Sequence, residues 1–189
     1  MAKRFGTTST LAYALLGLVA RRERTGYELA QLMREPIGFM WHARHSQIYP
    51  ELARLEKAGL VRHTLVRQAE RPDKKRYRIT PAGRAALRAW LSSPLDESPA
   101  RDEFTLRVFS MWLARKSKAR ALLSDELARH EAMLRRHQEV EVQARRHLTL
   151  KGRLGEMHFA NYATLRRGVS YERHVVDWLR WLIAELDTR

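Results

Sequence analysis

The 189-residue sequence contains no cysteine. Disulfide bonds, thiol catalysis and cysteine-based zinc sites are therefore excluded, and the composition fits a reducing cytosol. No stretch reaches the ~20 consecutive apolar residues that a membrane-spanning helix needs. The P-loop, G-x-S-x-G and G-x-G-x-x-G motifs are absent as well. We therefore expect no enzyme, no resident cofactor and no membrane partner.

The N-terminus has a basic start followed by an apolar run over residues 11–20, which superficially resembles a secretory signal. Within that run Leu11, Leu15 and Leu18 keep helical spacing, and the next patterned segment follows directly. We interpret the run as the first helix of a folded domain and expect a cytoplasmic protein.

Acidic residues are scarce in the first half of the chain. The net charge is +15, with a pI near 10.9. Residues 1–90 hold 18 lysines and arginines and 7 acids, whereas residues 91–189 hold 18 and 14. Such a surface predicts an anionic partner; nucleic acid is the first candidate and an anionic membrane surface the second. An enzyme that acts on acidic substrates is a further alternative, supported by charge alone.

A composition change marks a domain boundary. The segment SSPLDESP, residues 92–99, contains two prolines, three serines and two acids, and is typical of a linker. We expect one domain at residues 1–92, a linker at 93–101 and a second domain at 102–189. No internal repeat is evident.

The sequence of the first domain predicts three helices, a hairpin and a fourth helix. Helix one covers residues 10–20. Thr25 and Glu28 form a capping-box pair that begins helix two, which Pro36 and Gly38 end. Ser46 is the expected cap of helix three. Alternating residues 60–68 and 75–80 predict two strands, and Thr80 with Pro81 begins a helix that runs to Leu91.

The third predicted helix is amphipathic. At 100° per residue, Ile48, Leu52 and Leu55 form the core stripe. Glu51 and Glu56 fall at the flanks, so the outer face holds no carboxylate. That face carries Ser46, Gln47, Pro50, Ala53, Arg54 and Lys57, with Tyr49 at its border. Pro50 would lie at the end of the first turn and remove at most one hydrogen bond.

Three helices followed by a basic hairpin are typical of the winged helix-turn-helix order, in which the third helix enters the DNA major groove. The hairpin carries Arg67, Arg71, Lys74, Lys75, Arg76 and Arg78 against two acids. The alternative to DNA binding is that the third helix is an ordinary amphipathic surface helix and the hairpin a solvated charged loop. The fold class is thus mainly α with a small β-hairpin: a winged helix-turn-helix domain plus an α-helical C-terminal dimerisation domain.

The segments GYEL (26–29), SQIYPELARLEKAGLV (46–61) and KRYRITPAGRAAL (75–87) resemble the PadR family of transcriptional regulators. Residues 102–113 and 171–186 resemble the helical C-terminal domain of its longer, virulence-activator type. The resemblance implies a dimeric, usually repressing, ligand-responsive regulator of double-stranded DNA, with no indication of the effector. A MarR-type regulator and a non-specific nucleic-acid-coating protein are the alternatives.

The expected DNA contacts follow from this arrangement. Gln47, near the start of the recognition helix, is predicted to read a base, most simply an adenine. The full set is Thr25, Tyr27, Ser46, Gln47, Tyr49, Arg54, Lys57, Arg71, Lys74, Lys75 and Arg76.

The second domain predicts two long helices. Ser117 is the expected cap of a helix over residues 118–150, whose partly wet seam contains Leu123, Leu127, His130, Leu134, His137, Ala144 and Leu148. The last helix, residues 171–186, has an apolar surface broad enough for a subunit interface. The expected homodimer residues are Tyr171, Val175, Trp178, Leu179, Leu182 and Leu186.

Two further groups are candidates for ligands. A small aromatic or apolar effector could bind among Phe109, Met111, Trp112, Phe159 and Tyr162, or these residues could form ordinary core. His42, His45, His130 and His137 have spacings that metal ligands use. Without cysteines or clustered carboxylates, we interpret them as wet surface histidines and expect no metal.

Overall fold

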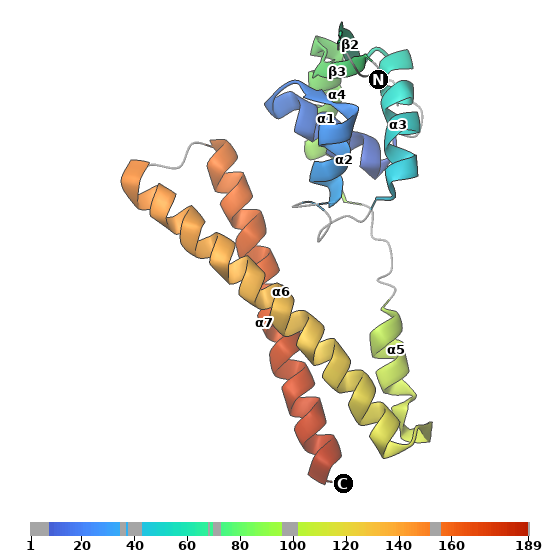
Figure 1. Ribbon diagram of the computed structural model, residues 1–189, viewed down its shortest axis with the longest axis vertical. Coiled ribbons are helices and arrows are strands. Elements are labelled where there is room, and N and C mark those ends of the chain that lie inside the picture. The colour runs from blue at the N-terminus through green and yellow to red at the C-terminus, as the bar shows by residue number, and fades with distance from the viewer. Residues whose placement is uncertain are drawn as a thin grey trace. The chain divides into compact units, whose positions relative to one another are not determined.

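The computed structural model describes residues 8–34, 37, 43–67, 69, 73–95, 102–151 and 156–188, with only the backbone at 146–151 and 156. The chain divides into two compact units, Met1–Ser98 and Pro99–Arg189 (Figure 1). The division falls inside the predicted linker at 93–101.

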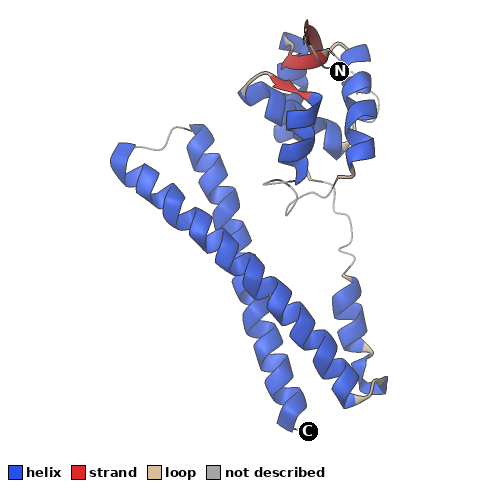
Figure 2. Ribbon diagram, in the orientation of Figure 1, coloured by secondary structure: helices blue, strands red, loops and turns tan. Residues whose placement is uncertain are grey.

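The first unit contains four helices and three short strands in its described part. In chain order these are α1 (Thr10–Arg21), β1 (Arg24–Thr25), α2 (Gly26–Arg34), α3 (His45–Lys57), β2 (Val61–Val66), β3 (Lys74–Ile79) and α4 (Pro81–Leu91). The strands form an antiparallel sheet in the order β1-β3-β2 (Figure 2). The sequence predicted β2 and β3 but not the two-residue β1, because so short a segment carries no alternation.

The core of this unit lies where α1, α2 and α3 meet the sheet. Leu15, Leu16 and Leu29 are fully buried there, with Tyr77 of β3 at 5% exposure. The predicted core stripe of α3 is confirmed, since Ile48, Leu52 and Leu55 are each 2% exposed or less.

The junction between α3 and β2 is closed by backbone hydrogen bonds. Gly59 has φ of +69°, a conformation that favours glycine. Its N–H donates to Glu56 O at 2.9 Å, and the Leu60 N–H donates to Leu55 O at 2.9 Å, which is a Schellman motif. The Leu60 carbonyl then accepts from Thr80 N at 3.0 Å. The end of α3 is thereby joined to the start of α4.

The second unit consists of α5 (Glu103–Phe109), the short 3₁₀ helix η2 (Met111–Leu113), α6 (Lys116–Lys151) and α7 (Glu156–Thr188) in its described part. Asp102 caps α5 by accepting from Thr105 N at 3.0 Å. Helices α6 and α7 lie side by side in opposite directions (Figure 1), since Arg120 pairs with Asp187 and Arg166 with Glu141.

Two predictions about helix starts in this unit were wrong. Helix α6 begins at Lys116, so Ser117 lies within its first turn and is not the cap. The Arg115 carbonyl accepts from Lys118 N and Ala119 N at 2.9 and 3.0 Å and begins the helix through the backbone instead. Helix α7 begins at Glu156 and continues through residue 171, where the sequence predicted its start.

The α6–α7 seam buries polar groups as well as apolar ones. His130 and His137 are only 8% and 7% exposed, so the prediction of wet surface histidines was wrong for this pair. Arg129 lies 2.9 Å from His130 Nε2, which makes that nitrogen an acceptor, and Nδ1 then donates to Glu172 at 2.5 Å. The arginine and the carboxylate allow the imidazole to be buried.

Glu141 is a second buried polar group in the seam. Its carboxylate accepts from Arg166 at 2.8 Å and from Arg145 at 3.1 Å. The hydrogen bond from Arg166 is the largest cause that holds the pKa of Glu141 below its ordinary value. Leu179 is fully buried in the same seam. The structure therefore assigns Leu179 to packing within the chain, which corrects its prediction as a subunit-interface residue.

We predict that Gly83→Ala destabilises the protein and that Gly17→Ala does not. A Cβ at Gly83 would lie 2.1 Å from the Leu60 carbonyl oxygen, whereas a Cβ at Gly17 would meet nothing within 4 Å. Thermal or denaturant unfolding should show a loss of about 2 kcal/mol for Gly83→Ala. The Gly17→Ala control should gain about 0.5–1 kcal/mol, because alanine favours the helix interior. Equal stabilities of the two variants would contradict the close approach of α4 to Leu60.

Candidate nucleic-acid interface

The outward face of α3 is the one that the sequence predicted. Ser46, Gln47, Pro50, Ala53, Arg54 and Lys57 are exposed. Tyr49 is 44% exposed, and Glu51 is only 7% exposed. Glu56 is half-buried beside His63 of β2. The exposed face of α3 is therefore free of carboxylates and compatible with a polyanion.

Helix α3 begins two residues earlier than the predicted cap implies. Arg44 is the N-cap residue, with extended backbone at φ −71° and ψ 141°, so Ser46 lies inside the helix. The Gln47 side chain bonds back to this N-cap residue, because its Oε1 accepts from Arg44 N at 2.9 Å. This bond orients the amide and leaves both its N–H donors and one oxygen lone pair unused by the cap.

Pro50 consequently lies in the second turn of α3 rather than at the end of the first. Its missing N–H would otherwise donate to the Ser46 carbonyl, so one intrahelical hydrogen bond is lost. Both groups lie on the exposed face, where water can satisfy the carbonyl.

Tyr49 packs against the start of α2. A Cβ at Gly26 would lie 2.7 Å from the Tyr49 ring, so glycine permits this close contact. The His45 ring lies 5.3 Å from the Tyr49 ring, centre to centre. The ring of Tyr49 thus has a structural role in addition to its exposed surface, a role that helical periodicity did not reveal.

The predicted capping box at the start of α2 is confirmed. Thr25 Oγ1 accepts from Glu28 N at 3.3 Å, and Glu28 Oε2 accepts from Thr25 N at 2.7 Å. The bond from the Thr25 backbone N–H is the largest cause that lowers the pKa of Glu28. Thr25 Oγ1 also donates to Glu28, so the predicted contact residue Thr25 already uses its hydroxyl. Tyr27 is 59% exposed.

Arg54 is oriented by a buried carboxylate that the sequence placed only at a flank. Glu51 accepts from Arg54 Nη1 at 3.0 Å and from Ser9 Oγ at 2.9 Å. The Arg54 side chain remains 76% exposed. The (i, i+3) spacing of Glu51 and Arg54 was the available sequence signal, but Ser9 is distant in sequence.

The wing, which is the hairpin of β2 and β3, presents its cations on two faces. Lys74, Lys75 and Arg76 are all exposed. Because side chains alternate along a strand, Lys74 and Arg76 share one face of β3, and Lys75 shares the face of the buried Tyr77. The predicted contact residue Arg71 lies outside the described residues.

The residues predicted for an aromatic pocket do not come together in the described part of the chain. Phe109 ends α5 and Trp112 belongs to η2; each is 80% exposed and close in sequence to the start of α6. Phe159 and Tyr162 lie near the start of α7, whereas the Arg120–Asp187 pair places the end of α7 beside the start of α6. At 1.5 Å per residue the two groups are about 40 Å apart along α7.

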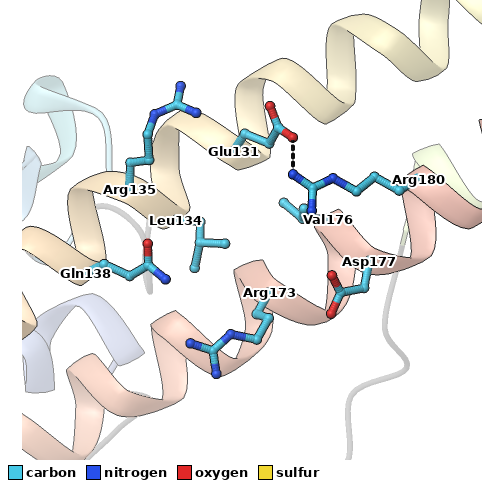
Figure 3. Close-up of a pocket in the computed structure, with 8 residues that line it drawn as sticks. All are labelled: Glu131, Leu134, Arg135, Gln138, Arg173, Val176, Asp177 and Arg180. Atoms are coloured by element: carbon cyan, nitrogen blue, oxygen red, sulfur yellow. Dashed lines mark hydrogen bonds and ion pairs between the residues drawn. The ribbon is translucent and has the colours of Figure 1, made fainter.

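A polar groove lies between α6 and α7 in the second unit. Figure 3 shows Leu134 of α6 and Val176 of α7 between the helices, beside an ion pair in which Arg180 donates to Glu131 at 2.7 Å. Its lining is completed by Arg135, Gln138, Arg173 and Asp177. Within the described segments, no three His, Asp or Glu side chains gather as a metal site. Among those same residues, no helix is long and apolar enough to cross a membrane.

Known proteins share this architecture over nearly its full length. The negative transcriptional regulator PadR of Bacillus subtilis is 30% identical over 182 residues, which cover 94% of this chain and 97% of that protein. Its crystal structure in complex with operator DNA matches with a TM-score of 0.79 at 29% identity, covering 94% of this chain and 99% of the other.

Two further structures match at similar coverage. The B. subtilis PadR complex with p-coumaric acid has a TM-score of 0.71 at 29% identity, over 95% of this chain and 99% of that one. The Vibrio cholerae virulence activator AphA has a TM-score of 0.73 at 26% identity, over 95% of this chain and 99% of that one.

Two protein families match consecutive parts of the chain. The transcriptional regulator PadR-like family matches residues 15–89, and the C-terminal domain of the virulence activator alpha family matches residues 100–187. Together with the full-length similarity to B. subtilis PadR, these matches establish the identity of the fold and of its class: the chain belongs to the PadR-like family of transcriptional regulators.

Proposed function

We propose that the chain is a homodimeric, sequence-specific DNA-binding repressor whose α3 helices enter the major groove. The observation that carries this proposal is the exposed face of α3, which presents Gln47, Arg54 and Lys57 and no carboxylate. The basic wing of β2 and β3 follows directly in the chain. The crystal structure of B. subtilis PadR with operator DNA supports the same use of this fold.

The second unit is proposed to form the dimer and to sense an effector. Tyr171 and Trp181 expose 52% and 55% of their surfaces on α7, and Phe109 and Trp112 are more exposed still. Such large apolar groups favour a protein interface. The complex of B. subtilis PadR with p-coumaric acid supports a response to a small molecule. We propose regulation by binding in the cytoplasm, without a catalytic step or resident cofactor.

A non-specific nucleic-acid-coating protein is the second candidate, because the net charge of +15 would suit it. Selection of duplex DNA from a random pool separates the two. A specific regulator should enrich a palindromic site whose half-sites lie about one helical turn, or a multiple of it, apart. Retention of all sequences equally would contradict sequence-specific binding and favour the coating protein.

Gln47 is predicted to read a base, and two substitutions separate this role from helix capping. Gln47→Ala should lose about 1–3 kcal/mol on the selected duplex and little on random DNA. It should also lower stability by about 1 kcal/mol, because the bond to Arg44 N disappears. Gln47→Glu keeps a cap acceptor but removes both amide donors, so it should keep the stability and still lose the base preference. An unchanged selected sequence for Gln47→Glu would remove Gln47 from base recognition.

The wing cations are predicted to contact phosphates. Lys75→Ala and Arg76→Ala should each weaken binding to the selected duplex and to random DNA alike. Each lost phosphate contact should reduce the slope of log K against log salt by about 0.9. Because the two side chains lie on opposite faces of β3, a reduced slope for one variant alone would identify the face that meets the DNA. A change in base preference without a change in slope would contradict the assignment.

A further inference from the structure

The carboxylate of Glu51 joins two parts of the first unit that lie far apart in sequence. It belongs to α3, yet Glu51 is only 7% exposed and bonds to Ser9 at the start of α1. Oε1 accepts from Ser9 Oγ at 2.9 Å, and Oε2 accepts from Arg54 Nη1 at 3.0 Å. Each carboxylate oxygen therefore has its own partner, one at the start of α1 and one on α3.

Ser9 is itself held in place. It is the N-cap residue of α1, and its Oγ accepts from Ala12 N at 3.1 Å. With that lone pair occupied, the hydroxyl proton is directed to Glu51. The Glu51 carboxylate is consequently held by α1 as well as by its contact with Arg54.

We propose that Glu51 is a positioning residue for DNA recognition, which holds the Arg54 guanidinium in one orientation toward the nucleic acid. The inference rests on the proposed function, because it assigns Arg54 a place at the DNA surface. It adds a residue that does not touch DNA, and it makes the capping serine of α1 part of the recognition apparatus.

Arg54 has a long side chain, and its conformational freedom affects the free energy of binding. A free arginine side chain loses rotamer entropy when it binds. The bond to Glu51 removes much of this freedom before DNA arrives, and the planar guanidinium keeps further N–H donors for a phosphate or a guanine edge. Such preorganisation increases affinity for a site that matches the fixed geometry.

Burial separates the two charges of the pair. The Glu51 side chain is 9% exposed and that of Arg54 is 76% exposed. An approaching phosphate therefore meets the cation, while the anion stays behind it within the fold. This asymmetry lets a carboxylate belong to the recognition helix without repelling DNA from its surface.

A double-mutant cycle on the full-length protein tests the proposal. The probes are the duplex that the wild type enriches from a random pool and a random duplex of equal length. Glu51→Gln should weaken binding to the selected duplex by about three- to tenfold, which is within the usual range for coupled neighbours. In an Arg54→Ala background the same change should have less than a twofold effect. Binding to the random duplex should not fall.

Glu56→Gln is the matched control. Glu56 lies on the same helix but contacts His63 of β2 instead of a cation on the outward face. Any effect of Glu56→Gln should be equal with Arg54 or Ala at position 54. A melting curve for each variant accompanies the binding measurement.

Arg54→Lys provides a second test that leaves Glu51 in place, and the exposure of Arg54 makes the fold insensitive to it. Lysine keeps the charge but lacks the planar set of donors, so selective binding should fall while random-duplex binding persists. Full selectivity in Arg54→Lys would overturn the proposal. So would an equal loss from Glu51→Gln in both backgrounds, or unchanged or tighter binding by Glu51→Gln. If the wild type enriches no sequence, the proposed function itself fails.

Discussion

The backbone of Gly59 and Leu60 is the constraint on which the first unit depends. The Schellman bonds end α3 there. The Leu60 carbonyl accepts from the Thr80 N–H at 3.0 Å, and the Gly59 carbonyl accepts from the Thr80 hydroxyl at 2.7 Å. Thr80 in turn caps α4 by accepting from Gly83 N at 3.0 Å. These two adjacent carbonyls thus join α3, both long strands and α4. A shift there would move the β2–β3 hairpin relative to α3.

The outward side chains of α3 are held in place by residues that are not themselves on its exposed face. Gln47 is oriented by the Arg44 N–H, Tyr49 by the absence of a side chain at Gly26 and Arg54 by the buried Glu51. Each outward group therefore has a structural partner as well as a surface. Such partners reduce the conformational freedom of the interface before binding, which favours selective over indiscriminate contact.

The two units distribute their charges differently. In the second unit, arginines pair with carboxylates across α6 and α7, as in Arg120–Asp187, Arg166–Glu141 and Arg180–Glu131. Exposed pairs such as Arg120–Asp187 add little stability, but together with the buried Glu141 and the buried His130–Glu172 pair they define the register of the two helices. The excess positive charge is left mainly to the first unit, where an anionic partner would meet α3 and the wing.

Local chemistry in the sequence determined the helices of the first unit, the strands of the wing and the outward face of α3. Helical period placed Ile48, Leu52 and Leu55 on the core side, and caps such as Thr25 with Glu28 act within a few residues. Predictions failed where the partner is distant or the choice is between equivalent local acceptors. Ser46 was a reasonable cap by residue type, but the backbone places Arg44 there and Gln47 bonds back to it.

Only the tertiary structure decided which apolar and polar groups are buried together. Helical periodicity placed His130, His137 and Leu179 on particular helix faces, but the antiparallel pairing of α6 and α7 is what buries them. Within that seam His130 is hydrogen-bonded by Arg129 and Glu172, and Leu179 packs between the helices. The same pairing places Phe109 and Phe159 toward opposite ends of the helices, which no residue-type argument could foresee. The link from Ser9 through Glu51 to Arg54 likewise spans more than 40 residues of sequence. It exists because hydrogen bonds depend on proximity in space, and that proximity is created by the packing of α1 on α3.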